Sequence, residues 1–333
     1  AGWFVSRRHL PDAKRNADVA LTALCRRDEA ARATMEAHFG LPAGSGFGDW
    51  RRMVEEAPLD AVLIATPNDL HYEQAKAALE RGLHVLVEKP MTLRSEHAHE
   101  LVALARAKGR KLAVALNPPH WAHCHRARRA LQSESMGEFE SGSIYWTGSA
   151  AHLFGRAPRP ADMSGVVPPT DYRSDPERNG GGYFADGGPH LVSELLWLTG
   201  LRVKRVTALM DALPADIRIA VCFEMENGAM ATITSIGDSR YEQRRVRNVF
   251  SSANGTVTIN YAEFETHIQI KDNEPVSFRE ATLTPVSGPI ANFVDAILGR
   301  AELFSPGEHG AEVVDVVQAV YESARTGRMI GLQ

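Results

Sequence analysis

Lys89 stands in a short motif at a position from which its side chain can reach a bound substrate. The motif, Glu88-Lys89-Pro90, directly follows the apolar segment His84–Val87, which is typical of a buried strand. Ligands of parallel sheets bind beyond the carboxyl ends of the strands, so a lysine there can reach a substrate hydroxyl, and the proline fixes the direction of the chain. From the spacing alone, an exposed lysine in a turn is a more common outcome than a lysine that binds substrate.

A glycine-rich segment carries an aspartate and a histidine four positions apart. Residues 180–190 read GGGYFADGGPH and contain Asp186 and His190. Glycines let a backbone approach a ligand closely, and both side chains lie on one face if a helix has begun by Asp186. A histidine beside a carboxylate can act as a general acid or base. The alternative is that Asp186 only caps the helix and that His190 is a buried structural residue.

Three further histidines invite a metal interpretation. His120, His123 and His125 surround Cys124, a grouping of ligand types that zinc prefers. No carboxylate or second cysteine in the sequence completes such a site, so we expect no metal.

The first third of the chain alternates strand and helix patterns. Strand patterns cover Val19–Cys25, Asp60–Ala65, His84–Val87 and Lys111–Leu116, and helix patterns cover Glu29–His38, Tyr72–Arg81 and Arg94–Lys108. Nearly continuous apolar strands separated by amphipathic helices predict a doubly wound parallel sheet. We therefore predict an α/β fold whose first domain spans residues 1–117.

The pattern changes after Asn117. Helices are predicted near Arg126–Gln132, Pro189–Thr199, Ile290–Leu298 and Glu308–Thr326, and strands over Ile217–Glu224, Ala229–Ser235, Arg245–Ser251, Thr256–Asn260 and Glu265–Ile270. This predicts a second, α+β domain over residues 118–333 with a large, open, mostly antiparallel sheet. The exposed face of such a sheet needs a cover, so we expect a homo-oligomer, a dimer or a tetramer.

The composition limits the classes of partner. The net charge of −4 over 333 residues gives no electrostatic case for nucleic acid or an anionic membrane surface. The longest apolar stretch, near Asp60–Ala65, is too short to span a bilayer. Three separated cysteines, Cys25, Cys124 and Cys222, favour a reducing compartment, so we expect a cytoplasmic location. Because the sequence starts at Ala1, an export signal before it stays an open alternative.

Several stretches together resemble the glucose–fructose oxidoreductase / inositol dehydrogenase (Gfo/Idh/MocA) family. They are residues 64–71 (IATPNDLH), 82–90 (GLHVLVEKP), 180–190, 292–297 (NFVDAI) and 321–327 (YESARTG). The resemblance covers essentially the whole chain. It implies a Rossmann domain followed by an α+β domain, and hydride transfer between a nicotinamide ring and a hydroxyl-bearing carbon of a sugar, inositol or related polyol. It does not specify the substrate.

The resemblance also implies roles for individual residues. His190 would be the base for the hydroxyl proton, so oxidation should speed up with pH as it deprotonates, while Lys89 would hydrogen-bond the same oxygen. Asp186 would orient His190 or bind a further hydroxyl. The implied cofactor contacts are Thr66, Pro67, Asn68, His71, Glu88 and Lys89, and the implied substrate contacts are Asn117, Arg173, Asp186 and His190.

The start of the chain departs from the family pattern. The family opens with a strand and a G-x-G-x-x-G turn that binds the pyrophosphate. Here the chain opens on AGWFVS, so Gly2 is the expected second glycine, and Gly2, Trp3 and Phe4 are expected to contact the cofactor. The first strand is missing from the sequence, and we expect a truncated sequence rather than a sheet without its central strand.

Arg26 and Arg27 bear on the choice of cofactor. They follow the strand pattern Val19–Cys25, where enzymes that use NAD usually place a carboxylate for the ribose 2′-OH. Two guanidinium groups would attract a 2′-phosphate instead, so we expect NADP. NAD is the alternative, if both arginines point to solvent and Asp28 binds the ribose.

Two other functions are compatible with this scaffold. One is a glycosidase that oxidises its substrate transiently and recovers its NAD. The other is a non-catalytic dinucleotide-binding regulator, which has no need for Lys89, Asp186 and His190 together.

Overall fold

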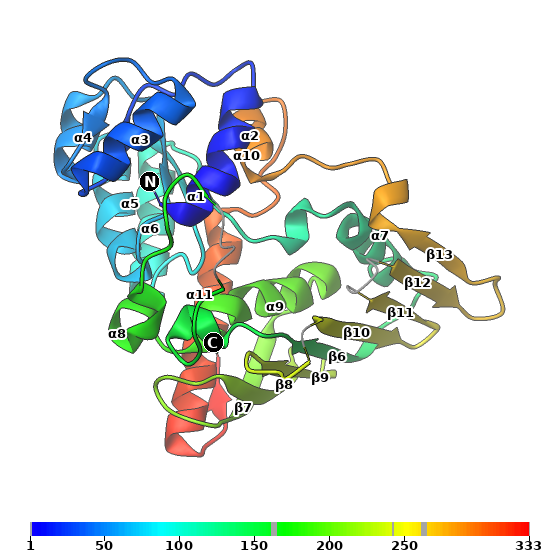
Figure 1. Ribbon diagram of the computed structural model, residues 1–333. Coiled ribbons are helices and arrows are strands. Elements are labelled where there is room, and N and C mark those ends of the chain that lie inside the picture. The colour runs from blue at the N-terminus through cyan, green and yellow to red at the C-terminus, as the bar shows by residue number, and fades with distance from the viewer. Residues whose placement is uncertain (1, 161–164, 242, 261–264, 333) are drawn as a thin grey trace.

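The computed structural model describes residues 2–160, 165–241, 243–260 and 265–332. Figure 1 shows the helices and short strands of the N-terminal third on one side and a broad open sheet on the other. Parallel strands followed by a large, mostly antiparallel sheet confirm the predicted fold class. No helix in the described ranges is long and apolar enough to cross a bilayer.

Short parallel strands form two small sheets in the N-terminal region. One contains β1 (Leu24–Cys25) and β2 (Gly46–Phe47), and the other contains β3 (Ala61–Ile64), β4 (His84–Val87) and β5 (Leu112–Val114). The predicted strand over residues 19–25 is therefore wrong except at its end. Residues 19–23 line a cavity, and no strand of the described chain forms a ladder with them.

Helices accompany these sheets. They are α1 (Trp3–Arg7), α2 (His9–Arg15), α3 (Glu29–Phe39), α4 (Trp50–Glu56), α5 (His71–Glu80) and α6 (Ser95–Lys108). The Asp28 carboxylate accepts from the Ala31 N–H at 2.7 Å and caps α3. Gly40 ends α3 in the left-handed conformation, which glycine adopts without strain.

A nine-stranded sheet dominates the rest of the described chain. Its order is β13-β12-β11-β10-β6-β9-β8-β7-β14, and of these neighbours β6 and β9 are parallel while the others are antiparallel. The strands are β6 (Phe139–Thr147), β7 (Val203–Met210), β8 (Arg218–Met225), β9 (Met230–Ile236), β10 (Arg245–Ser252), β11 (Gly255–Asn260), β12 (Glu265–Ile270), β13 (Val276–Arg279) and β14 (Ile330–Gly331). The strands predicted between Ile217 and Ile270 are confirmed as β8 to β12. The sequence does not predict β6, because Gly142 and serines interrupt its apolar alternation.

Two helices on one face of this sheet begin earlier than predicted. They are α7 (Ala122–Leu131) and α9 (Tyr183–Thr199). Glu280 accepts from the first N–H groups of α7 at 3.0 and 2.8 Å, and Asp216 accepts from N–H groups at the start of α9 at 3.0 and 2.9 Å. Caps from such distant residues leave no local signal in the sequence. Short turns connect these elements: η1 (Asn68–Leu70), η2 (Pro118–His120), η3 (Ala151–Phe154), η4 (Tyr172–Ser174), α8 (Pro176–Asn179) and η5 (Glu280–Thr282).

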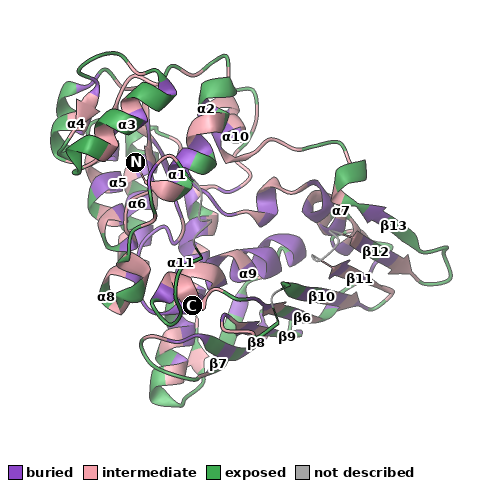
Figure 2. Ribbon diagram, viewed as in Figure 1, coloured by how far each residue is buried: buried purple, intermediate pink, exposed green. Residues whose placement is uncertain are grey.

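The last two helices return the chain to the N-terminal region. Ile290 and Phe293 of α10 (Pro289–Ile297) share an apolar core with Leu86 of β4. Helix α11 (Gly307–Thr326) packs against α6 and β5 as well as α9 and β7. Figure 2 shows that α9, between these layers, is mostly buried. The C-terminal helices thus link the parallel strands to the large sheet, with α9 between them.

Candidate active site

A single cavity of about 2190 Å³ collects nearly all the residues that the sequence singles out. Its lining includes Gly2, Trp3, Phe4, Arg26, Arg27, Thr66, Pro67, Asn68, Glu88, Lys89, Asn117, Arg173, Asp186 and His190. Residues from the loops after β1, β3, β4 and β5 therefore meet residues from α9 and the turn η4. The lining includes residues of α1 as well as residues near the start of α9.

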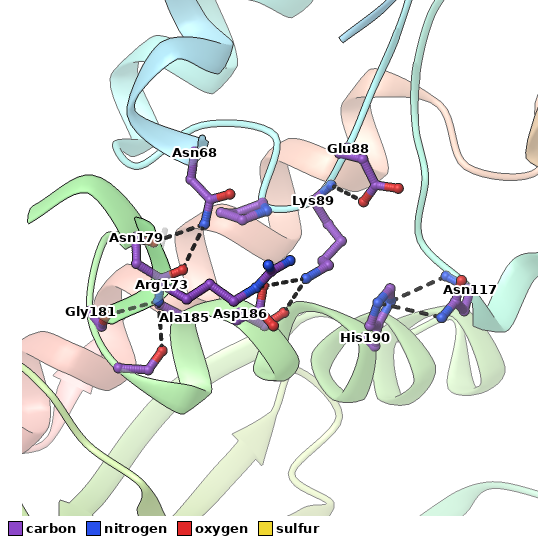
Figure 3. Close-up of polar contacts among 12 residues, drawn as sticks. Asn68, Glu88, Lys89, Asn117, Arg173, Asn179, Gly181, Ala185, Asp186 and His190 are labelled. Atoms are coloured by element: carbon purple, nitrogen blue, oxygen red, sulfur yellow. Dashed lines mark hydrogen bonds and ion pairs between the residues drawn. The ribbon is translucent and has the colours of Figure 1, made fainter. Parts of the chain in front are cut away.

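Lys89 and Arg173 converge on Asp186 (Figure 3). Lys89 Nζ donates to the Asp186 backbone oxygen at 2.7 Å and to Oδ1 at 2.8 Å, and Arg173 Nε donates to the same Oδ1 at 3.0 Å. Burial acts to raise the pKa of Asp186, but the charges of Arg173 and Lys89 outweigh it and hold that pKa far below its usual value. Asp186 is thus ionised, and one N–H of the Lys89 ammonium remains for a ligand.

His190 lies one helical turn after Asp186 but pairs with Asn117. The Asn117 backbone N–H donates to His190 Nδ1 at 3.3 Å, and the Asn117 side-chain nitrogen lies 3.4 Å from Nε2. Burial, and then the charge of Lys89, lowers the pKa of His190 to about 3. The ring is therefore neutral at ordinary pH, and the Nδ1 lone pair that can take a proton accepts from the Asn117 N–H in this structure. With this pKa, the expected rise in rate as His190 deprotonates would fall below the usual assay range.

Asp186 and His190 lie four positions apart on one helix, as expected, but their side chains do not pair with each other. Helix α9 begins at Tyr183, so both residues are helical. The Asp186 carboxylate is engaged by Lys89 and Arg173 and not by the His190 ring. The carboxylate is therefore placed to hold the Lys89 ammonium group.

A buried carboxylate and a tyrosine fix the start of α9. Asp216 accepts from Gly182 N and Phe184 N, and Tyr321 donates to Asp216 Oδ1 at 2.6 Å. The Tyr321 hydroxyl also accepts from Ala185 N at 2.9 Å. A Cβ on Gly182 would lie 2.1 Å from the Asp216 carbonyl oxygen, so the close approach requires glycine there. The sequence gives no role to Asp216 or Tyr321, although Tyr321 belongs to the C-terminal stretch that resembles the family.

Asn68 binds the glycine-rich loop as well as lining the cavity. Its Nδ2 donates to the Asn179 backbone and side-chain oxygens at 3.0 and 3.2 Å, and Asn179 Nδ2 donates to the Gly181 and Gly182 carbonyls at 2.9 and 2.8 Å (Figure 3). Asn68 and Asn179 are both buried. This network fastens the loop after β3 to the loop before α9, a role that local sequence does not indicate.

His71 lies behind the cavity rather than in its lining. The residue is fully buried, with Nδ1 at 2.8 Å from the Pro90 oxygen and Nε2 at 3.1 Å from the Thr66 oxygen. It therefore holds the loop after β3 against the Lys89 loop. The cofactor contact that we expect of His71 is not available in this arrangement, because the two backbone segments cover its ring.

The arginines after β1 keep their place at the cavity. Arg26 is half-buried and Arg27 is exposed, and both belong to the lining. Asp28, the alternative ribose ligand, already uses one carboxylate oxygen to cap α3. Guanidinium groups and the Asp28 carboxylate thus lie together at this part of the cavity.

The histidines around Cys124 point to separate partners. His123 Nδ1 lies 2.6 Å from Glu280, His120 Nδ1 lies 3.0 Å from the Ser287 oxygen, and His125 Nε2 lies 2.7 Å from the Pro119 oxygen. The described part of the chain contains no group of three histidine, cysteine, aspartate or glutamate residues arranged to hold a metal ion.

Several known proteins of similar sequence or structure are sugar oxidoreductases by name. D-xylose 1-dehydrogenase (NADP(+)) 2 of Haloferax volcanii is 26% identical over 93% of this chain and 91% of that protein. D-glucoside 3-dehydrogenase of Escherichia coli is 24% identical, with 86% of this chain and 84% of that protein covered. The structure of aldose-aldose oxidoreductase from Caulobacter crescentus complexed with glycerol matches with a TM-score of 0.82 at 22% identity, over 99% of this chain and 97% of that chain.

Two family models match consecutive parts of the chain. The model described as an oxidoreductase family with an NAD-binding Rossmann fold matches residues 1–116. The model of the GFO/IDH/MocA C-terminal domain matches residues 124–258. Because both models describe one family and together span most of the sequence, the chain belongs to the Gfo/Idh/MocA family of oxidoreductases.

Proposed function

We propose that this protein transfers a hydride between a nicotinamide dinucleotide and a hydroxyl-bearing carbon of a sugar or related polyol. The observation that carries the proposal is that Lys89, Asp186 and His190 share one cavity with the loop after β3 and with Arg26. The lining fits a dinucleotide, since it offers cationic side chains at one end and the polar Lys89 group at the other. When bound, the nicotinamide ring supplies or accepts the hydride.

The residues of the chain divide the remaining chemistry between them. Lys89 keeps one N–H for the reacting oxygen and stabilises the negative charge that develops there. His190 takes the hydroxyl proton on oxidation, for which a neutral ring is required, and the protonated ring returns that proton on reduction. Asp186, held by Arg173, keeps the ammonium group of Lys89 in place. Asn117 fixes the orientation of the His190 ring.

Sugars are the substrate class that the relatives favour. Their names include a D-xylose dehydrogenase, a D-glucoside dehydrogenase and a 1,5-anhydro-D-fructose reductase. A structure of levoglucosan dehydrogenase with NADH and levoglucosan has a TM-score of 0.83 at 18% identity. Inositols and other polyols share the vicinal hydroxyls of these compounds and belong in the same test.

NADP is the cofactor that we propose, with NAD as the alternative. Arg26 and Arg27 line the cavity after β1, and the Asp28 carboxylate is partly used by the cap of α3. Guanidinium groups bind phosphate through charge-assisted hydrogen bonds. The name of the Haloferax volcanii relative includes NADP, whereas two structures of similar fold are complexes with NADH.

A substrate panel tests the proposal. Sugars, inositols and sugar acids are each incubated with NADP and with NAD, and the nicotinamide absorbance is followed. We expect reduction of the cofactor by at least one sugar or polyol, with a higher kcat/KM for NADP. Calorimetry that shows no binding of either cofactor would refute the proposal.

We also propose that the protein is a homo-oligomer through the outer face of the nine-stranded sheet. Tyr145, Leu209 and Met230 are 37%, 75% and 54% exposed on strands of this sheet. Exposed large apolar side chains on an open sheet favour a covering subunit. Light scattering after gel filtration should give a multiple of the chain mass, and a monomer at all concentrations would contradict the proposal.

A further inference from the structure

His9 forms a buried pair with Glu88. His9 Nε2 lies 2.6 Å from Glu88 Oε1, and the two residues are only 5% and 8% exposed. Burial acts to raise the pKa of Glu88, yet the hydrogen bond and charge of His9 hold that pKa below its usual value. Glu88 is thus a buried, ionised carboxylate that depends on the histidine, whereas the family resemblance leads us to expect it among the cofactor contacts.

The second oxygen of Glu88 holds Lys89. Glu88 Oε2 accepts from the Lys89 backbone N–H at 3.1 Å, and the Lys89 side chain continues to Asp186. Figure 3 shows Glu88 above and Asp186 below the lysine. A continuous series of polar contacts therefore runs from α2, through the end of β4, to the start of α9.

The same histidine touches the segment that we expect to contact the cofactor. The Phe4 ring packs edge-on against His9, with ring centroids 5.7 Å apart and an interplanar angle of 72°. Phe4 is 40% exposed and lines the cavity. A ligand that contacts Phe4 therefore lies one side chain away from the His9–Glu88 pair.

We infer that His9 is a positioning residue that acts through Glu88 to fix Lys89 and to aim its ammonium group at Asp186. Without His9, the Glu88 carboxylate would be buried without its partner, which favours a proton or water on that carboxylate and weakens its hold on the Lys89 N–H. The consequence for catalysis rests on the proposed function. The consequence for the placement of Lys89 does not, and it can be measured without a substrate.

Chemical labelling of lysines tests the placement directly. Wild type, His9→Leu, His9→Gln and the control His97→Leu are treated with an amine-acylating reagent, and the rate at each lysine is read by mass spectrometry. Glutamine retains an N–H that can reach Glu88, and His97 stacks on Tyr72 away from the cavity. We expect Lys89 to react about tenfold faster in His9→Leu, as for the loss of one charge-assisted hydrogen bond, and near the wild-type rate in the other two variants.

Lys76, which is paired with Glu100, serves as the internal reference. Unchanged Lys89 labelling in His9→Leu, or an equal rise at Lys76, would overturn the inference, since the second result indicates general loosening. Once the panel has identified an active sugar, the kcat of His9→Leu should be lower than that of wild type, while the KM for the sugar should change little. The kcat of His9→Gln should be close to that of wild type. If wild type oxidises no compound of the panel, the proposed function fails, and the labelling result alone decides the role of His9.

Discussion

Replacing His190 with glutamine should make the protein less sensitive to acid. Burial and Lys89 lower the pKa of His190 from an ordinary value of 6.5 to about 3 in the folded protein. As the pH falls below 6.5, the unfolded chain binds a proton that the folded protein does not bind until the pH nears 3. The unfolding free energy of wild type therefore falls as the pH drops from 6.5 towards 3. The stabilising contribution of the neutral His190 ring is fully present only above pH 6.5.

The magnitude follows from the width of that window. One pKa unit corresponds to about 1.36 kcal/mol, so at pH 5 the loss through His190 is about 1.36 × 1.5, or roughly 2 kcal/mol. Near pH 3 the loss reaches its limit of about 5 kcal/mol, the product of about 3.5 units and the same factor. Glutamine does not titrate, so the variant lacks this part of the pH dependence.

Urea unfolding at pH 8 and pH 5 measures the effect. The quantity compared is the change in unfolding free energy between the two pH values, in wild type, His190→Gln and the control His97→Gln. Other buried histidines, such as His120 and His309, contribute equally to all three proteins and cancel in the comparison. We expect the change in His190→Gln to be smaller by about 2 kcal/mol and the control to follow wild type. Equal changes in all three proteins would show that His190 titrates alike in the folded and unfolded states, and would refute the reasoning.

Three further predictions concern the groups around the cavity. Lys89→Ala should lower turnover by about 10²–10⁴-fold, and Asp186→Asn by less because the amide keeps a hydrogen-bonding shape; turnover per folded molecule near wild type in both would contradict the assignment. Arg26→Asp should weaken NADP binding by about 1.5–3 kcal/mol in calorimetry and spare NAD, whereas an unchanged ratio of the two affinities would remove Arg26 from cofactor choice. Tyr321→Phe removes the hydroxyl between Asp216 and the start of α9, and should lower the unfolding free energy by about 1–3 kcal/mol; a denaturation midpoint equal to that of wild type would show that this hydroxyl does not stabilise the helix start.

The sequence predicts most of the fold because its elements carry strong local signals. The strand His84–Val87 is apolar and bounded, and its limits agree with β4 residue for residue. The strand over residues 19–25 fails because strand length depends on neighbours that form a ladder, and these are not encoded locally. Strand β6 is missed because the partners on both sides, and not its own alternation, keep it in the sheet.

The residues of the candidate site also fall into two groups, those that the sequence indicates and those that it does not. Lys89 and His190 can be singled out from the sequence because each stands in a short motif: Lys89 directly follows β4, and His190 ends the glycine-rich stretch 180–190. His9, Asn179 and Asp216 act through partners far along the chain, so no window of sequence joins them to the site. Their contribution is visible only as hydrogen bonds between buried groups. Residue types at motif positions therefore indicate the chemistry, while the contacts that aim those residues require the folded chain.

Cofactor reduction by His190→Gln tests the central claim most directly. The variant is first shown to be folded by the urea experiment and to bind the cofactor in calorimetry. The rate of a single turnover with an active sugar is then followed at the nicotinamide absorbance. We predict a rate about 10²–10⁴-fold below wild type, with cofactor affinity within a few-fold, because His190 is assigned to the substrate hydroxyl and not to the dinucleotide. A folded, cofactor-binding His190→Gln protein that reduces the cofactor at the wild-type rate would contradict the account.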